Sequence, residues 1–384
     1  MSDCTALVLG GGIGGLTTAR HLRNLLPADQ RVVVVEKRKS FSVCMSNLWI
    51  MTGERNGPAD VEREMARLAG VGIEAMEAEI LSIDPEARSV VTTAGGLSGD
   101  HLVIALGADK NSESVPGLAE AALNLYDPEG ALQIQHALEE FTGGRIVVLI
   151  SRTPFSCPAA PYEAAFLIDS ALRERGLRDS TELALYTPED QPMLVAGPTV
   201  GPALVEMLEE RGIELHWQEI AMKIDSAEKR ILFELEDTAF DLLVGVPPHT
   251  VPSVLSQSGL VDASGWVPVD QTTLRTKFDG VFAIGDATSV RLANGMFLPK
   301  AGVFADGQAR NVAEAIAAEV NGTGPVKQYD GHGFCHIDVG NGEAAFGSGN
   351  FYGIPAPRVS MEAPSAHFRK EKEEMERSLL ALLD

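Results

Sequence analysis

Short apolar runs that alternate with glycine-rich turns and helical patterns organise the chain. Thr5–Leu9, the run "RVVVVE" and Gly144–Ile150 each have the length and near-continuous apolar character of a buried β-strand. A helical pattern begins near Leu16, after the first strand, and another covers residues 162–175. Buried strands that alternate with helices predict an α/β fold built on parallel sheets.

The turn after the first strand has the spacing of a dinucleotide-binding loop. Gly10, Gly12 and Gly15 form Gly-x-Gly-x-x-Gly between the strand and the helix. Such glycines allow a tight turn, a close approach of the backbone to a pyrophosphate, and close packing of helix on strand. The helix amino terminus adds N–H donors and the positive end of its dipole. The segment therefore predicts a dinucleotide site rather than a ligand-free turn.

An acidic residue stands where a ribose would need one. The second strand ends in Glu36, which is 21 residues after Gly15, and Lys37 follows it. A carboxylate at this position accepts hydrogen bonds from a ribose diol. Strand, glycines, helix, second strand and acid occur in the required order, so Glu36 and Lys37 join the predicted cofactor site.

Two later segments extend this site. The strand and turn "LVIALGA" contains Ala105 and Gly107 and resembles the crossing into the second domain of two-dinucleotide flavoenzymes. In the strand "FDGVFAIGDAT", the pair Gly285-Asp286 resembles the one that places a carboxylate at the ribityl or pyrophosphate end of FAD. We therefore expect FAD as the cofactor.

A long helical pattern starts after Pro299, in the segment "LPKAG". The amino terminus of such a helix can stabilise negative charge on a reduced flavin. We therefore add Lys300 and Ala301 to the predicted cofactor-binding residues. The alternative for Lys300 is a solvated lysine without a role.

The chain is long enough for two or three domains. It has 384 residues, 45% of them hydrophobic, and 38 glycines. We predict two Rossmann-like domains arranged as in glutathione reductase, plus a carboxy-terminal domain. Residues 1–110 and 241–325 form the FAD-binding domain, with a helix over 60–69 and then a small β-meander. Residues 111–240 form the second Rossmann-like domain, and 326–384 form the carboxy-terminal domain or tail.

The strand Gly144–Ile150 leads into a turn without glycine, "SRTPFSCPAAPYEAAF". Two prolines and Phe155 stand where a nicotinamide dinucleotide would need bare backbone N–H groups. Cys157 precedes a helix, and a helix amino terminus stabilises a thiolate. Glu163 follows six residues later and can exchange a proton beside it. The alternative is a buried, unreactive cysteine.

The other cysteines show no metal-site or disulfide-framework pattern. The chain has four cysteines and no Cys-x-x-Cys pair, so we expect no metal site. Cys4 opens the first strand and is expected to pack as a small hydrophobe. Cys335 lies in a β-like section of the tail. The final segment "HFRKEKEEMERSLLALLD" predicts a charged helix that packs on its own domain or a dimer mate, and peripheral membrane contact stays open.

The charge of the chain excludes some partners. The formal net charge is −23, which repels nucleic acid and anionic membrane surfaces. A basic protein partner and simple solubility both fit this charge. We find no signal peptide and no run of 18 apolar residues, so we expect a cytoplasmic protein, or a periplasmic one if a leader has been removed.

The motifs together resemble one family. "TPFSCPAAPYEAA", "SVCMSNLWIMTGER", "AIGDAT", "LPKAG" and "FCHID" resemble the flavoprotein subunit of flavocytochrome c sulfide dehydrogenase and, more broadly, the sulfide:quinone oxidoreductases. The resemblance implies FAD attached covalently through Cys44, in the segment that also holds Asn47. It implies a redox-active disulfide between Cys157 and Cys335, with Glu163 beside it.

The resemblance also implies an activity. Sulfide attacks the disulfide and leaves a persulfide on Cys157, and the Cys335 thiolate passes two electrons to the flavin. The product is zero-valent sulfur or polysulfide, and the acceptor is a cytochrome c or a quinone. Two alternatives remain open: an activity like that of type II NADH dehydrogenases or pyridine nucleotide-disulfide oxidoreductases, and a non-catalytic flavoprotein that serves in redox sensing or assembly.

Overall fold

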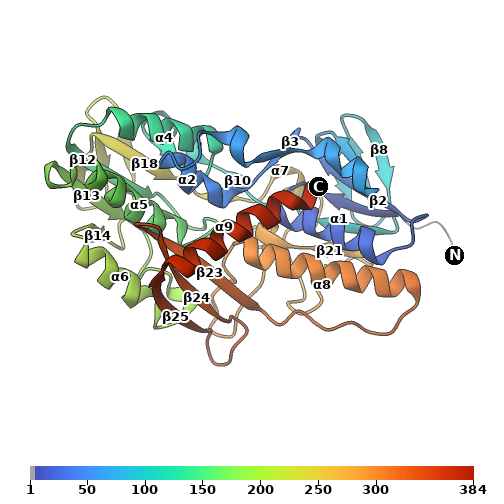
Figure 1. Cartoon of the computed structure of the whole chain (residues 1–384). Helices are drawn as coiled ribbons and strands as arrows, with labels where there is room; N and C mark the ends of the chain where they lie inside the picture. Colours follow the sequence, from blue (N-terminus) through green and yellow to red (C-terminus); the bar gives the residue numbers. More distant parts are fainter. Residues whose placement is uncertain (1–4) are drawn as a thin grey trace.

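The computed structural model describes residues 5–384, so the expectation for Cys4 lies outside the described residues. Two five-stranded parallel sheets form the two ends of the molecule, and a three-stranded antiparallel sheet with the last long helix lies between them (Figure 1). The predicted class, an α/β protein with Rossmann-like parallel sheets, is confirmed.

The first sheet has the strand order β21-β9-β1-β2-β5, and its recorded pairings are parallel. It takes strands from both the first hundred residues and the segment near residue 282. Helices α1 and α8 pack against each other beside it (Figure 1). The bounds are β1 Thr5–Leu9, β2 Arg31–Glu36, β5 Glu74–Glu77, β9 His101–Ile104, β21 Val281–Ala283, α1 Ile13–Leu25 and α8 Gly302–Asn321.

The second sheet has the order β11-β18-β12-β13-β14 and is also parallel. β18 pairs with β12 along its length, so the predicted boundary at residue 241 is placed too early. The bounds are β11 Leu123–Asn124, β12 Gly144–Ile150, β13 Thr181–Tyr186, β14 Glu214–His216, β18 Leu242–Val246, α4 Pro128–Glu140, α5 Ala160–Glu174 and α6 Val200–Glu210.

The carboxy-terminal segment is an antiparallel sheet followed by a helix. Strands β23 (His332–Gly340), β24 (Glu343–Asn350) and β25 (Arg358–Ser365) pair in that order. Helix α9, Ala366–Leu380, begins where the Ser365 hydroxyl accepts a hydrogen bond from the Phe368 amide. It packs against β23 and β24, and Leu379 and Leu380 at its end join the apolar cluster that includes α1 (Figure 1). The helix thus packs within its own chain, one of the two arrangements that we expected.

One predicted helix is wrong. Residues 60–69 form a short 3₁₀ turn, the strand β4 and a second 3₁₀ segment instead of an α-helix. β4, Glu62–Glu64, pairs with β3, Ser40–Ser42, so backbone pairing to a distant segment overrides the local helical pattern. The β-meander that we predicted follows as β6 (Ile80–Asp84), β7 (Ser89–Thr92) and β8 (Gly95–Ser98).

The remaining elements are short. The two-stranded sheet of β10 (Asp109–Lys110) and β19 (His249–Thr250) connects the two parallel sheets. The others are α2 Asn47–Met51, α3 Leu118–Ala121, α7 Ser253–Ser256, β15 Lys223–Asp225, β16 Arg230–Leu232, β17 Asp237–Ala239, β20 Val267–Pro268 and β22 Thr288–Ser289.

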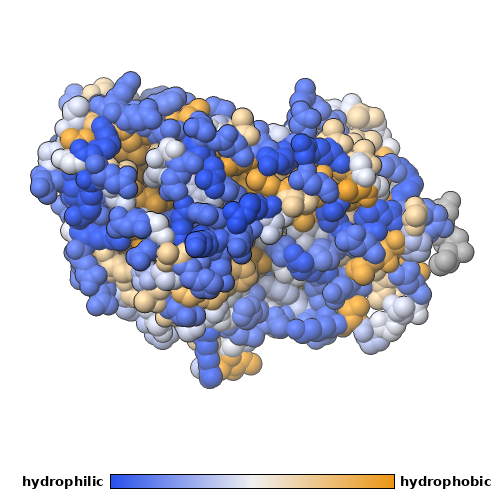
Figure 2. Space-filling model, in the orientation of Figure 1, coloured by the Kyte–Doolittle hydropathy of each residue, from blue (hydrophilic) through white to orange (hydrophobic). Residues whose placement is uncertain are grey.

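The face of the molecule in Figure 2 is mostly hydrophilic, with small scattered apolar areas. No helix among residues 5–384 combines the length and the apolar character that a membrane crossing requires. The buried apolar clusters lie on the faces of the two parallel sheets and under the carboxy-terminal sheet.

Candidate functional site

Two adjoining cavities lie between the sheets. The larger has a volume of about 500 Å³ and the smaller a volume of about 120 Å³. They share a wall, made of Ile13, Cys44, Met45, Cys157, Glu163, Ala301 and Gly302. A cofactor in the larger cavity would therefore touch the residues that open onto the smaller one.

Glycines form one end of the larger cavity because side chains do not fit there. A Cβ on Gly10 would lie 2.3 Å from the carbonyl oxygen of Ala105. A Cβ on Gly15 would lie 1.9 Å from the carbonyl oxygen of Gly10, while one on Gly12 would meet no protein atom within 4 Å. Gly10 and Gly15 thus bring β1, α1 and β9 together, and Gly12 leaves its open space to a ligand.

Glu36 ends β2 at the wall of this cavity. Its Oε2 accepts a hydrogen bond of 2.7 Å from the amide of Gly11, and Oε1 accepts one of 3.0 Å from Arg38. Burial acts to raise the pKa of Glu36, but the hydrogen bonds and charge of Arg38 and the Gly11 amide lower it. The carboxylate therefore stays charged, as an acceptor for a ribose diol must.

The opposite wall is formed by the strand end and the helix start that the sequence predicted. Asp286 lines the cavity, and its Oδ2 accepts a hydrogen bond of 2.5 Å from the Ser156 hydroxyl. Ala301 caps α8, so the amino terminus of this 20-residue helix opens into the cavity. A negatively charged or electron-rich group there lies at the positive end of the helix dipole.

Lys300 does not line the cavity. Its amino group donates hydrogen bonds to the carbonyl oxygens of Asp286, at 2.6 Å, and of Thr288, at 3.1 Å. It also lies 3.2 Å from the ring centroid of Trp266. The amino group of Lys300 thus holds the turn that carries Asp286, and its predicted contact with the cofactor stays a prediction.

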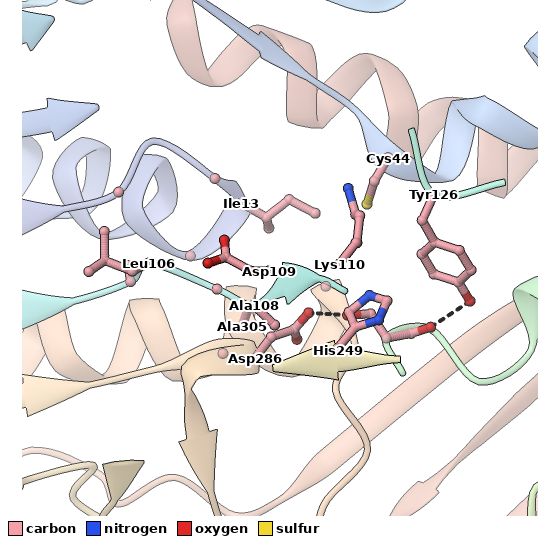
Figure 3. A pocket seen from close by; sticks show the side chains of 18 of the residues that line it. Ile13, Cys44, Leu106, Ala108, Asp109, Lys110, Tyr126, His249, Asp286 and Ala305 are labelled. Atoms are coloured by element: carbon pink, nitrogen blue, oxygen red, sulfur yellow. Dashed lines mark hydrogen bonds between the residues drawn. The ribbon is translucent and has the colours of Figure 1, made fainter. Parts of the chain in front are cut away.

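Cys44 and Asn47 lie on the segment that follows β3. Cys44 is exposed to the open cavity, and Figure 3 shows its sulfur beside the amino group of Lys110. The Nδ2 group of Asn47 donates a hydrogen bond of 3.1 Å to the carbonyl of Leu125. Its Oδ1 is buried without a protein partner.

Buried polar atoms around the larger cavity fit a polar cofactor. Besides Asn47 Oδ1, Ser42 Oγ and His249 Nε2 are buried without a protein partner. The His249 Nδ1 lies 3.0 Å from the carbonyl oxygen of Pro247, which assigns the proton to Nδ1 and leaves Nε2 as an acceptor. Figure 3 shows His249 and Asp286 on the same side of the cavity. Such lone atoms, with the glycine cradle and Glu36, suit a flavin dinucleotide.

Cys157 sits in the turn between β12 and α5. Its backbone has φ +46°, and its amide donates a hydrogen bond of 2.6 Å to the carbonyl of Lys300. The Tyr126 hydroxyl donates one of 2.6 Å to the neighbouring carbonyl of Ser156. Burial raises the pKa of the Cys157 thiol well above its usual range, with Cys335 and Glu163 adding to the rise. The expectation of a stabilised thiolate is wrong here, because burial and the neighbouring Cys335 and Glu163 oppose ionisation of the thiol.

Cys335 comes from β23 and lines the smaller cavity together with Cys157. Both cysteines are free thiols in this structure. Burial and the charge of Glu163 raise the pKa of Cys335 to about 12, against a lowering by Lys372. The two predicted redox cysteines, 178 positions apart in the sequence, are thus brought to one cavity.

Glu163 lies on the shared wall and has a buried cation as its partner. Its Oε2 accepts a hydrogen bond of 2.7 Å from the amide of Asp338 and forms an ion pair with Lys372 of α9. The side chains of Glu163 and Lys372 are 2% and 3% exposed. Burial raises the pKa of Glu163, and Lys372 acts to lower it.

The turn after β12 in the second sheet differs from a glycine-rich phosphate loop. The turn after β12 carries Cys157 instead of glycines. At the end of β13, where a Rossmann domain has its ribose-binding acid, Glu189 accepts hydrogen bonds from Tyr162, at 2.6 Å, and Thr187, at 3.0 Å. The acid is therefore occupied within the protein.

Most predicted residues gather around the two cavities. Those that line the larger one are Gly10, Gly12, Glu36, Lys37, Cys44, Asn47, Ala105, Gly107, Cys157, Glu163, Gly285, Asp286 and Ala301. Gly15 lies behind them, and Cys335 lines the smaller cavity. Sequence reasoning missed Lys110, Tyr126, His249 and Lys372. No feature in the sequence of the charged final helix singles out Lys372.

Comparison with known proteins gives the class. Residues 5–151 and 163–318 match the family described as "Pyridine nucleotide-disulphide oxidoreductase". Two Rossmann-like sheets with a dinucleotide cradle define an oxidoreductase of this architecture. The chain belongs to this family. Residues 152–162, the turn with Cys157, lie between the two matched ranges, and residues 319–384 lie beyond them.

The relatives narrow the class. The chain is 24% identical over 360 residues to the mouse mitochondrial sulfide:quinone oxidoreductase, covering 88% of this chain and 77% of the relative. It is 25% identical over 361 residues to an alternative NAD(P)H-ubiquinone oxidoreductase of Arabidopsis thaliana, covering 82% and 67%. The fold is that of the sulfide:quinone oxidoreductase of Aquifex aeolicus, with a TM-score of 0.87 and 23% identity over 99% of this chain and 91% of that one.

Proposed function

We propose that the protein is an FAD-dependent oxidoreductase that oxidises sulfide, or a related sulfur species, through Cys157 and Cys335. The observation that carries this proposal is their meeting, with Glu163, at a small cavity that shares a wall with the dinucleotide cavity. The name of the mouse relative supports the substrate class. A non-catalytic role would leave this convergence of two thiols and a carboxyl without a purpose.

FAD fits the larger cavity by the groups that line it. Glu36 would hold the adenosine ribose, the Gly10 turn would hold the pyrophosphate, and Asp286 would hold the ribityl chain. The start of α8 would face the flavin ring. FAD bound there supplies a two-electron acceptor that can be reoxidised by a separate electron acceptor.

The chemistry of the cysteines begins from their disulfide. A hydrosulfide ion attacks Cys157 Sγ, the S–S bond breaks, and a persulfide forms on Cys157 while Cys335 leaves as a thiolate. Release of the outer sulfur as zero-valent sulfur and re-formation of the disulfide give two electrons to FAD. The balance is one hydrosulfide oxidised to one sulfur atom, with one proton released and two electrons transferred.

Glu163 handles the proton in this proposal. Its carboxyl lies on the wall shared by the two cavities, and its negative charge raises the pKa of both Cys157 and Cys335. Its raised pKa brings a carboxyl closer to the range in which it can accept and return a proton near neutrality. A buried proton acceptor beside the thiols removes the proton that sulfide oxidation releases.

We further propose that Cys44 carries the FAD through a thioether. Its thiol is exposed to the larger cavity beside the amino group of Lys110. After denaturation in acid, flavin should remain on the wild-type protein and be released from the Cys44→Ser variant. Flavin retained by the denatured variant would place the attachment elsewhere.

The acceptor that we propose is a quinone rather than a cytochrome c. The mouse relative is named a sulfide:quinone oxidoreductase, and the Arabidopsis relative is named an NAD(P)H-ubiquinone oxidoreductase. Protein reduced by sulfide should be reoxidised by a short-chain quinone faster than by cytochrome c. The opposite order would restore the cytochrome proposal. A homodimer and the cellular location remain predictions of the sequence.

Anaerobic addition of sulfide to the purified yellow protein tests the proposed substrate. Sulfide should bleach the flavin, and NADH should not, since Glu189 is occupied and the turn after β12 has no glycines. Bleaching by NADH, with no response to sulfide, would favour the NADH dehydrogenase-like alternative and overturn this proposal.

A further inference from the structure

The carboxy-terminal helix turns a charged face inward. Arg369, Lys372 and Glu376 are at most 7% exposed, although α9 is among the most highly charged segments of the chain. Burying charges is unfavourable unless each has a partner. The partners of these three residues therefore show what the helix is docked against.

Lys372 is paired with the carboxyl at the sulfur cavity. Its amino group contacts Glu163 Oε2, and it lines the smaller cavity with both cysteines. Its ammonium also lies 5.7 Å from the ring centroid of Trp49. Lys372 is thus the cation of the described chain that is in direct contact with Glu163.

The rest of the inward face anchors this pair. Arg369 forms an ion pair of 2.9 Å with Asp338, whose own amide donates to Glu163. Glu376 forms an ion pair of 2.6 Å with Arg55. Since these contacts flank Lys372 on the same helix, its amino group is held in register with Glu163.

We propose that Lys372 is a positioning residue of this site, supplied by the carboxy-terminal helix, which holds Glu163 as a carboxylate facing the two cysteine thiols. The proposal rests on the proposed roles of those thiols. It makes α9 a part of the site, because the helix provides the charge that Glu163 needs in order to accept a proton.

The charges around Glu163 make the effect of this pair predictable. Glu163 is faced by Lys372 from α9, by Asp338 and Cys335 from β23, and by Cys157 from the turn before its own helix. His336 of β23 faces Lys372, and burial lowers its pKa and favours the neutral ring, while Glu371 contacts it from the outer side. Among these groups, Glu163 raises the pKa of Cys335 and Lys372 lowers it. Removing the charge of Glu163 should therefore lower the pKa of the Cys335 thiol, and removing the charge of Lys372 should raise it.

Alkylation of Cys335 tests this without sulfide or flavin chemistry. The purified protein, with its thiols reduced, is treated with iodoacetamide at one alkaline pH, high enough to keep Glu163 ionised in Lys372→Met as well, and the modified Cys335 peptide is quantified by mass spectrometry. Below the pKa, the rate follows the thiolate fraction, so one pKa unit changes it about tenfold. Lys372→Met should slow the reaction, Glu163→Gln should speed it, and Lys372→Arg should keep the wild-type rate.

Matched controls separate charge from structure. Lys370→Met makes the same substitution two residues away, at an exposed position of α9, and should leave the rate unchanged. The double variant Lys372→Met/Glu163→Gln buries no unpaired charge and should react at close to the wild-type rate. It also keeps the test decisive if Lys372→Met alone does not fold. A change in the same direction for both single variants, or a double variant as slow as Lys372→Met, would overturn the proposal.

The pH profile of flavin reduction by sulfide gives a second measure. Without the Lys372 cation, Glu163 is harder to ionise, so the acid limb should move to higher pH in Lys372→Met and stay in place in Lys370→Met. An equal loss of rate at every pH would show that Lys372 is only a structural tether. If sulfide fails to reduce the wild-type flavin, the proposed function fails, while the alkylation result still decides the role of Lys372.

Discussion

Arg369 provides the sharpest test of how α9 is held. Its side chain is 7% exposed and reaches Asp338, which is 1% exposed, at 2.9 Å. It also pairs with Glu54 and Glu373 and lies 4.2 Å from the ring centroid of Trp49. The substitution Arg369→Met keeps much of the apolar stem but leaves the Asp338 carboxylate buried without its cation.

The expected cost is large because one buried charge loses its partner. Removing one member of a buried ion pair typically destabilises a protein by about 3–5 kcal/mol. The hydrogen bond that Asp338 accepts from Trp49, at 3.0 Å, remains and favours the lower end of this range. For a chain of this length, about 3 kcal/mol corresponds to a fall of roughly 4 °C in the apparent Tm.

Thermal unfolding followed by far-ultraviolet circular dichroism measures this change. The control is Arg377→Met on the same helix, whose ion pair with Glu374 has an N–O distance of 4.0 Å and side chains 63% and 68% exposed. An exposed pair contributes between about 0 and 1 kcal/mol. Arg377→Met should therefore lower the Tm by about 2 °C or less. Equal shifts for the two variants would refute the reasoning that the inward face anchors α9.

Two further predictions concern the glycine cradle and a buried histidine. Gly15→Ala should disrupt the first sheet, since its Cβ would lie 1.9 Å from the Gly10 carbonyl oxygen. Gly12→Ala should fold normally and bind less flavin, because a Cβ there meets no protein atom. Circular dichroism and the flavin-to-protein ratio check both variants, and a normal flavin content in Gly15→Ala would contradict the proposed role of the glycines. Burial lowers the pKa of His249 to about 4, so the unfolded chain binds the extra proton between pH 6.5 and 4. The stability of the wild type relative to His249→Phe should therefore be constant above pH 6.5 and fall by up to about 3 kcal/mol as the pH drops to 4, and a difference that does not depend on pH in urea titrations would contradict this.

The long central strands of both parallel sheets could be predicted because local and global signals agree there. β1 and β12 have the predicted bounds, since their apolar runs are buried on both faces and end at turns that the sequence marks clearly. The spacing of the glycines at positions 10, 12 and 15 identifies the tight turn and the close helix packing directly from the sequence. Where the structure of a segment depends mainly on its own sheet, the hydrophobic pattern is sufficient to predict the bounds of the strand.

The errors arose where distant contacts decide the structure. Residues 60–69 pair with β3, and β18 joins β12 from almost 100 positions away, so neither follows from local pattern. The contacts of Lys300 with two carbonyl oxygens and a tryptophan ring likewise follow from no spacing rule, although its predicted role is not among these errors. The pKa of Cys157 is set by burial, which a sequence does not display.

Lys372 was missed for a related reason. In the sequence it is one of many charges in a helix that we expected to pack on its own domain or a dimer mate, and their order does not mark which of them face inward. Its burial follows from the position of β23, which brings both Cys335 and Asp338 against α5. The candidate site therefore joins four segments that are far apart in the sequence, which carry Cys44, Cys157 with Glu163, Cys335, and Lys372. The segments of Cys44 and Cys335 were recognised only through a family resemblance.

The entry of electrons through sulfur is the central claim, and an anaerobic titration of the flavin with sulfide tests it most directly. We expect one equivalent of sulfide to bleach one flavin and to yield one zero-valent sulfur atom, and we expect the Cys335→Ser variant to stay oxidised. Full bleaching by sulfide in Cys335→Ser, or bleaching of the wild type by NADH and not by sulfide, would contradict the account.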